Sequence, residues 1–164
     1  MTTKSIIRIV LILLIITVNI GCDQFSKTIV KRSVLPYETI RVLNDHLTVT
    51  RVENSGAFLS AGDSMSKVSK QIFLTLVPII AMVLGLTYLV VKPVSNNTLI
   101  GVCFVIGGGV GNLFDRILYG SVTDFLYVKF GFFQTGIFNM ADVSIMVGIF
   151  VILLQFFLKR DYKP

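Results

Sequence analysis

The chain has no tryptophan, one histidine and two cysteines among its 164 residues, and only 15% of its residues are charged. His46 has no cluster of histidines or cysteines with which to share a metal ion. Cys22 and Cys103 both lie in apolar runs, where thiols usually act as small buried hydrophobic groups. No serine–histidine or cysteine–histidine spacing supports nucleophilic catalysis, and Ser26 with Lys27 leaves only a weak serine–lysine alternative. We therefore disfavour a metallopeptidase and expect neither a metal nor a cofactor.

Long apolar runs are the most prominent feature of the sequence. Hydrophobic residues make up 54% of the chain, the mean hydropathy is +0.81, and a soluble domain would carry about 25% charged residues. Because a helix needs about 20 apolar residues to cross a bilayer, the uncharged runs predict an integral membrane protein with four spans. We expect one membrane domain, with spans over about 7–29, 70–91, 96–115 and 138–158, an outer β-region over about 37–62 and an outer loop over about 116–136.

The net charge of +6 is the next clue. In a soluble protein it would suggest nucleic-acid binding, but here we expect membrane lipid, and no nucleic acid, as the partner of the positive charge. With four spans, the basic residues flanking the spans fall on one side, which the positive-inside rule makes cytoplasmic together with both termini. These residues are Lys4, Arg8, Lys92, Lys159, Arg160 and Lys163. The basic residues of segment 27–70 argue against this orientation, although acids partly offset them.

The first apolar run permits an alternative. Its end, Asn19-Ile20-Gly21-Cys22, is similar to a signal peptide that finishes at a lipid-acceptor cysteine. Such signals usually carry leucine where Asn19 stands, and three more spans follow. We therefore expect this run to be the first spanning helix.

Two outer segments carry strand patterns. β-branched and polar residues alternate over 38–52, with Asn44-Asp45 as the turn, and a smaller strand is predicted over 124–130, ended by Gly131. We expect a mainly α membrane protein, a four-transmembrane-helix bundle with a small extracytoplasmic β-sheet between helices 1 and 2 and a second outer loop between helices 3 and 4. Aromatic residues of that loop have two interpretations: either they dip toward the membrane interface or they only anchor the loops. They are Phe125, Tyr127, Phe130, Phe132 and Phe133.

Two acids are the main clue to chemistry. Asp142 is the only charged residue in the stretch 130–158, and only Lys129 separates it from Asp124 among charged residues. A carboxylate in or near a bilayer costs several kcal/mol unless it is paired, hydrated or used. Two carboxylates in a poorly hydrated site cannot both ionise easily, so one keeps a proton while the other acts as a base. Such a pair can hydrolyse an amide at the end of a spanning segment, although Asp142 could instead only cap a helix or pair with Arg116.

Other polar groups also have two interpretations. Asp23 and Lys27 are four residues apart on one helix face and can form a structural ion pair or serve the site. Asn112, Asp115 and Arg116 share a face at the end of the third span, where Arg116 could close the bundle by pairing with an acid or could orient a substrate.

The remaining signals are weaker when taken alone. Gly107 and Gly111, four residues apart, predict close packing of another helix. Asn54 and Gly56 would by themselves indicate an ordinary loop. Asn139 precedes the second acid by three residues at a helix N-terminus, where an anion is favoured.

Taken in order and spacing, five motifs resemble bacterial lipoprotein signal peptidase, the type II signal peptidase. They are Asp23-x-x-Ser26-Lys27, Asn54-x-Gly56, Gly107-Gly108-x-x-Gly111-Asn112-x-x-Asp115-Arg116, Val122-x-Asp124-Phe125 and Phe138-Asn139-x-Ala141-Asp142. The resemblance implies an aspartyl endopeptidase of the bacterial inner membrane that removes signal peptides from prolipoproteins by cutting before a diacylglyceryl-modified cysteine. It also implies inhibition by globomycin-like cyclic peptides.

The resemblance assigns roles residue by residue. Asp124 and Asp142 would be catalytic; Asp23, Lys27 and Asp115 would be structural polar contacts. The substrate-binding or dyad-supporting residues would be Asn54, Gly56, Asn112, Arg116 and Asn139. The chain has no tryptophan, notably none over 132–137, and in this it differs from many relatives. The difference bears on how the outer loop is anchored at the membrane interface. The competing class is a non-enzymatic small membrane transport or assembly factor with buried ion pairs, and in either case we expect a monomer.

Overall fold

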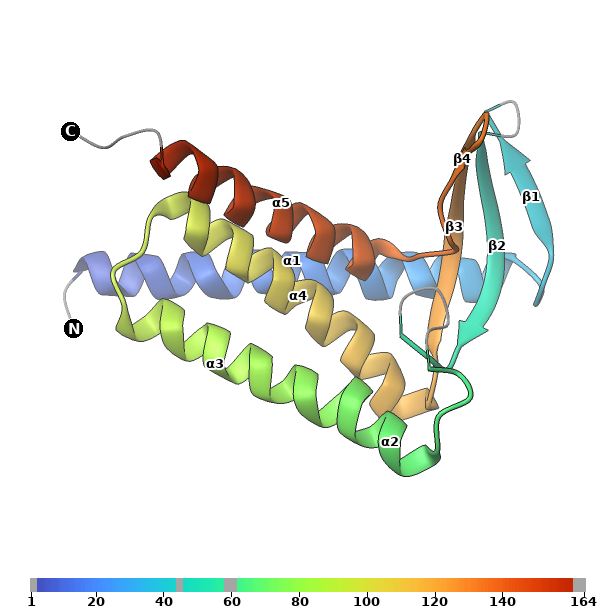
Figure 1. The fold of residues 1–164 in the computed structure, drawn as a ribbon, viewed down its shortest axis with the longest axis horizontal. Coiled ribbons are helices and arrows are strands. Elements are labelled where there is room, and N and C mark those ends of the chain that lie inside the picture. Colours follow the sequence, from blue (N-terminus) through green and yellow to red (C-terminus); the bar gives the residue numbers. More distant parts are fainter. Residues whose placement is uncertain (1–2, 44–45, 58–61, 161–164) are drawn as a thin grey trace.

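The computed structural model describes residues 3–43, 46–57 and 62–160. Four helices in this part of the chain are long and apolar enough to cross a membrane (Figure 1). They are α1 (Thr3–Ser33), a continuous helix made of α2 (Lys67–Gln71), the π-helical η2 (Ile72–Leu76) and α3 (Val77–Val91), then α4 (Asn96–Tyr119) and α5 (Met140–Arg160). The predicted four-helix membrane fold is confirmed.

The first helix is longer than its apolar run. α1 continues without a break through Asn19 and Cys22 to Ser33, and it buries Asp23 and Lys27 on its inner face. The Cys22 side chain is exposed, whereas Cys103 is buried in α4. The polar residues are therefore part of the helix, as expected for a retained first span.

Glycines let α4 pack closely against α1 and α5. A Cβ added to Gly107 would lie 2.7 Å from the Cβ of Asn19, and one added to Gly111 would lie 2.6 Å from Oδ2 of Asp23. The two glycines therefore face α1, where Asn19 and Asp23 repeat the same four-residue spacing, and the predicted close packing is confirmed. Gly108 faces α5, where an added Cβ would collide with the helix backbone.

A four-stranded antiparallel sheet follows the order β1-β2-β3-β4. Its strands are β1 (Thr39–Val42), β2 (Leu47–Asn54), β3 (Val122–Phe130) and β4 (Phe133–Gln134). Asn44 and Asp45 of the predicted turn, and 58–61 of the predicted outer region, lie outside the described residues. The outer loop between α4 and α5 thus supplies half of the strands, and a bulge in β2 precedes the pairing of Val52 with Asp124.

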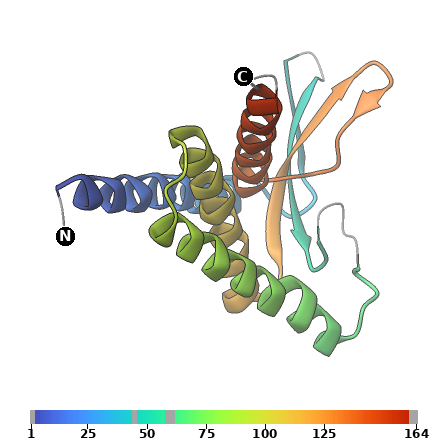
Figure 2. The same cartoon turned by 60° about the vertical axis from the view of Figure 1, so that its left-hand side comes forward.

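The sheet lies across one end of the bundle, while the start of α1, the α3–α4 link and the end of α5 lie at the other (Figure 1). Seen from a second direction, the sheet stands beside the end of α4 and the start of α5 (Figure 2). Phe125 is only 5% exposed and packs with Val30 of α1 and with Val34, the residue that follows the helix. The interpretation in which Phe125 dips toward the membrane interface is therefore wrong, because this ring fastens the sheet to α1.

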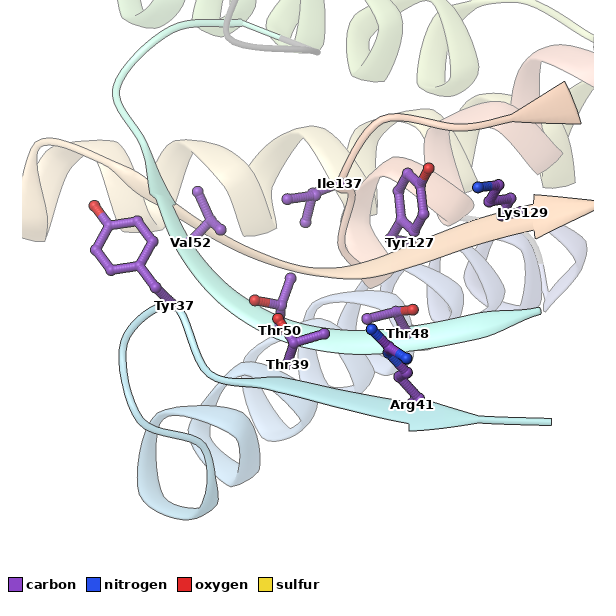
Figure 3. A pocket seen from close by; sticks show the side chains of 9 residues that line it. All are labelled: Tyr37, Thr39, Arg41, Thr48, Thr50, Val52, Tyr127, Lys129 and Ile137. Atoms are coloured by element: carbon purple, nitrogen blue, oxygen red, sulfur yellow. The ribbon is translucent and has the colours of Figure 1, made fainter. Parts of the chain in front are cut away.

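One face of the sheet forms a groove of about 620 Å³. Thr48, Thr50 and Tyr127 project into it from β2 and β3, and Ile137 borders it from the chain leading to α5 (Figure 3). None of the predicted site residues lines this groove, so the sheet's contribution to the site comes from the strand ends beside the bundle.

Candidate active site

Asp124 lies near the start of β3 and is held by two asparagines. The Nδ2 atom of Asn139 donates to Asp124 Oδ1 at 2.6 Å, and Nδ2 of Asn54 donates to Asp124 Oδ2 at 2.8 Å. All three side chains are buried, with Asp124 4% exposed. Each carboxylate oxygen therefore has a donor on a different element, which fixes the orientation of the carboxyl group.

The loop after β2 explains how Asn54 reaches the acid. Its Oδ1 atom accepts from the backbone N–H of Gly56 at 2.9 Å, the pattern of an Asx turn. Its Nδ2 atom donates both to the carbonyl of Ala57 at 3.0 Å and to Asp124. The turn therefore fixes the orientation in which the Asn54 amide reaches Asp124. Gly56 supports the acid indirectly, through its backbone N–H bond to Asn54.

Asp142 is placed by the cap of α5. The backbone N–H of Asp142 donates to Asn139 Oδ1 at 3.0 Å, and the backbone N–H of Asn139 donates to Asp142 Oδ2 at 3.1 Å. This reciprocal pattern is a capping box with aspartate in the third helical position. Asp142 therefore does cap α5, as one of its two interpretations held, but the capping bond occupies only its Oδ2 atom.

Two asparagines connect the two acids. Asn139 Nδ2 donates to Asn112 Oδ1 at 3.1 Å as well as to Asp124. Asn112 Nδ2 in turn donates to Asp142 Oδ1 at 2.9 Å. The structure therefore brings Asp124 and Asp142, which the sequence separates by a strand and a turn, into one hydrogen-bonded group.

Beneath this group lies a buried ion cluster. The Nζ atom of Lys27 is 2.7 Å from Asp23 Oδ2 and 2.9 Å from Asp115 Oδ2, and it also donates to Asn112 Oδ1 at 3.3 Å. The side chains of Lys27 and both acids are at most 2% exposed. The other oxygen of Asp23 accepts from the backbone N–H of Ala141 at 2.9 Å, which ties α1 to the first turn of α5. The cluster therefore positions the helix start that carries Asp142.

Arg116 forms no direct ion pair with Asp115 or Asp142 in the described part of the chain, so the interpretation as a salt bridge is wrong, although both acids and Asp124 act on its charge at longer range. Among the described residues, Asp115 forms its ion pair with Lys27, because the two meet at the buried α1–α4 contact. Arg116 instead donates from Nη2 to the carbonyl of Gly56 at 2.9 Å, while its buried Nε atom has no hydrogen-bond partner. Arg116 therefore binds the loop after β2 through Nη2, while its Nε–H has no hydrogen-bond acceptor.

A cavity of about 550 Å³ opens beside the acids. Among the described residues that line it, Asn112, Arg116 and Asp142 are polar and the others are apolar. The apolar lining is Ala57, Phe73, Leu74, Pro78, Ile145 and Met146. The cavity thus lies among the π-helical segment, α4 and α5, with polar groups gathered on one part of its wall.

The environment of Asp124 alters its acidity. Burial raises the pKa of this carboxyl to about 6, and the neighbouring carboxyl of Asp142 acts in the same direction. The amides of Asn54 and Asn139 oppose the rise by stabilising the ionised form. Asp124 can therefore exchange a proton near neutral pH, as a general acid or base must.

Some buried polar residues were missed by the sequence reasoning. Gln24 donates from Nε2 to Asp23 Oδ2 and Asp115 Oδ1, and Ser144 donates to Asn19 Oδ1. The four-residue spacing of Asn19 and Asp23 with Lys27 could have revealed Asn19 as part of the inner face of α1. No spacing pattern in the sequence marked Gln24 as part of this group.

A search of the described residues for metal ligands finds no group of three or more histidine, cysteine, aspartate or glutamate side chains that could hold an ion. The polar site is instead built from carboxylates, asparagine amides and one guanidinium group.

Comparisons with known proteins agree with this arrangement. The family described as Signal peptidase (SPase) II matches residues 14–158. A lipoprotein signal peptidase of Syntrophus aciditrophicus is 33% identical over 156 residues, covering 93% of this chain and 97% of the relative. One of Clostridioides difficile is 36% identical over 138 residues, covering 84% and 88%. A non-enzymatic transport or assembly role is therefore not favoured.

The fold also matches solved structures. A bacterial membrane enzyme structure obtained by the in meso method at 2.3 Å resolution superposes with a TM-score of 0.83 at 23% identity, covering 93% of this chain and 91% of that one. A second such structure, at 1.9 Å resolution, gives a TM-score of 0.75 at 23% identity, covering 88% and 91%. The match over most of the sequence, supported by this common fold, shows that the chain is a multi-pass membrane protease of the signal peptidase II family.

Proposed function

We propose that this protein removes signal peptides from prolipoproteins by hydrolysing the bond before a diacylglyceryl-modified cysteine, with Asp124 and Asp142 as the catalytic pair. The observation that carries the proposal is the position of the pair: two carboxyl groups joined through Asn112 and Asn139, with Asp142 on the wall of a mainly apolar cavity among spanning helices. The relatives carry the name lipoprotein signal peptidase, which supports the substrate class.

The two acids divide the proton chemistry. The ionised carboxylate takes a proton from water as the water attacks the scissile carbonyl, and the protonated carboxyl donates its proton to the carbonyl oxygen. The proton taken from water then passes to the leaving nitrogen as the C–N bond breaks, and the hydroxyl of the intermediate returns its proton to the second carboxylate as the carbonyl re-forms. Asp124, with its pKa raised to about 6 by burial, is suited to hold the shared proton. Bound substrate would displace water and strengthen this tendency.

The surrounding donors keep the pair aligned. The amides of Asn54 and Asn139 fix Asp124, and that of Asn112 fixes Asp142, so neither carboxyl needs to reorient during the reaction. Arg116 borders the same cavity, and we assign its guanidinium group to a carbonyl of the bound substrate. In this scheme Arg116 binds the peptide and does not transfer a proton.

The cavity suits a substrate that arrives from the membrane. Phe73, Leu74 and Met146 present apolar surface to a signal helix and to the acyl chains carried by the modified cysteine. Because Asp142 lies at the first turn of a spanning helix, the scissile bond would sit at the end of the substrate's own spanning segment.

We further propose a location in the bacterial inner membrane with both termini cytoplasmic and the acids near the outer face. Lys4, Arg8 and Lys92 lie at the end of the bundle away from the sheet, where the positive-inside rule favours the cytoplasm. Lys163, which carries part of this prediction, lies outside the described residues. We expect the protein to act as a monomer, since all the site residues named above come from one chain.

Globomycin-like cyclic peptides should inhibit the protein by occupying the cavity beside Asp142. A rigid cyclic peptide loses little conformational entropy on binding, and Arg116 and Asn112 offer it polar contacts on that wall. Inhibition should be competitive with the prolipoprotein in a cleavage assay.

A direct test uses detergent-purified protein and a diacylglyceryl-modified prolipoprotein, followed by gel shift and mass spectrometry of the products. We expect a cut immediately before the modified cysteine and no cut in the same precursor without its lipid. Equal cleavage of both precursors would contradict the proposed substrate, and no cleavage by folded protein would contradict the proposed activity.

A further inference from the structure

A second cavity, of about 270 Å³, lies where two spanning helices end at the sheet side of the bundle. Lys67 begins the helix that runs to Val91, and Gly120 caps the end of α4. Helix ends of this kind mark the level at which a membrane protein passes from hydrocarbon to headgroups. The lining residues are Ser55, Lys67, Lys70, Gln71, Leu74, Thr75, Arg116, Ile117 and Gly120.

The cavity is strongly basic. Of the described residues, Lys67, Lys70 and Arg116 line it and no acid does. The acid in contact with this group is Asp63, an exposed residue whose Oδ1 atom lies 3.9 Å from Lys70 Nζ and accepts from Ser55 Oγ at 2.7 Å. Lys70 Nζ also donates to Ser55 Oγ at 2.8 Å, which leaves two further N–H groups on the same ammonium. Because Asp124, Asp142 and Asp115 act electrostatically on Arg116, the excess positive charge of the cavity comes from Lys67 and Lys70, and Asp63 offsets it only in part.

The cavity also has an apolar side. Leu74 and Ile117 line it, and Ile117 is 61% exposed on the outer surface of α4. Phe73 beside it is 57% exposed. A ligand with an anionic head and a hydrocarbon chain matches this combination, because the head meets the lysines while the chain continues along the exposed apolar helix surfaces.

We propose that this cavity binds the headgroup of an anionic phospholipid, with the phosphate between Lys67 and Lys70 and an acyl chain along Leu74 and Ile117. Lysine binds phosphate as a compact charge with several donors, and each lysine near an anionic membrane surface strengthens binding about fivefold. A free phosphate ion would use the same lysines but would gain nothing from the apolar side.

The proposed lipid would lie next to the substrate cavity. Leu74 and Arg116 line both cavities, and Ser55, the partner of Lys70, stands between Asn54 and Gly56. A bound headgroup would therefore contact the same loop that fixes Asp124. The binding itself does not depend on the proteolytic activity.

The test measures lipid retention on the wild-type protein by native mass spectrometry, without substrate. The protein is mixed with equal amounts of phosphatidylglycerol and phosphatidylcholine, which differ in headgroup charge. We expect preferential retention of phosphatidylglycerol, a roughly fivefold loss in Lys67→Gln and a greater loss in the Lys67→Gln/Lys70→Gln double variant. Asp63→Asn, which removes the opposing charge, should increase retention.

Arg32→Gln serves as the matched control, because Arg32 is an exposed cation at the end of α1 and does not line the cavity. It should retain lipid like the wild type. Millimolar inorganic phosphate should leave the lipid bound; displacement by phosphate would overturn the phospholipid assignment in favour of a phosphate site. Equal retention of the two lipids, or equal losses in Lys67→Gln and Arg32→Gln, would overturn the proposal while leaving the proposed cleavage reaction untouched.

Discussion

Asn139 holds Asp124 through a 2.6 Å hydrogen bond from its Nδ2 atom to the carboxylate Oδ1 atom. The same asparagine uses its Oδ1 atom and its backbone N–H to cap the helix that carries Asp142. One fully buried residue therefore sets the relative position of the two acids.

We predict that Asn139→Ala lowers cleavage about 10²- to 10³-fold, as removal of one preorganised donor does in other active sites. It should also cost about 1 kcal/mol of stability through the lost helix cap. Rates and thermal unfolding of the purified variant check both effects. The control is Asn97→Ala, which removes an exposed amide contact between α4 and α5, to Gln155, and should leave cleavage unchanged; a comparable drop in both variants would argue against a special role for Asn139.

We predict that Asp124→Asn stabilises the protein at neutral pH. The pKa of Asp124, raised by burial to about 6, exceeds its unfolded value, so folding binds a proton more tightly and the ionised acid destabilises the fold as pH rises through 6. With a shift of about 2 pH units, the gain approaches about 3 kcal/mol above pH 7. Thermal unfolding at pH 8 and pH 3 measures it, because the destabilisation builds up between the unfolded pKa of about 4 and the folded pKa of about 6. The gain should be present at pH 8 and absent at pH 3, and a gain independent of pH would refute this origin.

Lys27→Met should be strongly destabilising. It leaves the buried carboxylates of Asp23 and Asp115 without their common cation, and breaking a buried ion pair from one side costs about 3–5 kcal/mol. Asp63→Asn, which removes a contact whose acid side chain is 49% exposed, should cost less than about 1 kcal/mol. Equal unfolding temperatures for the two variants in detergent would show that the buried cluster does not support the fold.

Gly111→Ala tests the close approach of α1 and α4. Its added Cβ would lie 2.6 Å from Asp23 Oδ2 and would displace the acid that anchors the first turn of α5. We expect a loss of about 1–3 kcal/mol and a fall in cleavage, both measured on purified protein. Gly21→Ala is the matched control, because no atom lies within 4 Å of the added Cβ, and alanine should stabilise this helix by about 0.5–1 kcal/mol.

Much of the fold was predictable because its signals are local. Four apolar runs specify the spanning helices, and alternation specifies the strands around 39–54 and 122–130. The role of Phe125 was not predictable, since an aromatic residue in an outer strand can face lipid or protein with the same local pattern. Tertiary packing against Val30 and Val34 decides between these outcomes.

The partners of charged side chains were harder to predict than their importance. Asp115 and Arg116 are adjacent in sequence, yet they belong to different contacts: Asp115 points to Lys27 on α1, and Arg116 reaches Gly56 in the loop after β2. Helical spacing shows which residues share a face but not which distant element packs there. The bridging of the two acids by Asn112 and Asn139 likewise depends on the meeting of α4 with the start of α5.

The most direct test of the catalytic pair is the cleavage rate of Asp124→Asn and Asp142→Asn on a diacylglyceryl-modified prolipoprotein. The matched control is Glu38→Gln, because Glu38 is exposed and lines neither the substrate cavity nor the cavity proposed to bind lipid. All three should be folded and inserted in the membrane, as judged by thermal unfolding. We predict that the first two lose at least about 10²-fold in rate and accumulate uncleaved lipid-modified precursor, while the control cleaves like the wild type. Wild-type cleavage by either of the first two variants would contradict the assignment of Asp124 and Asp142 as the catalytic pair.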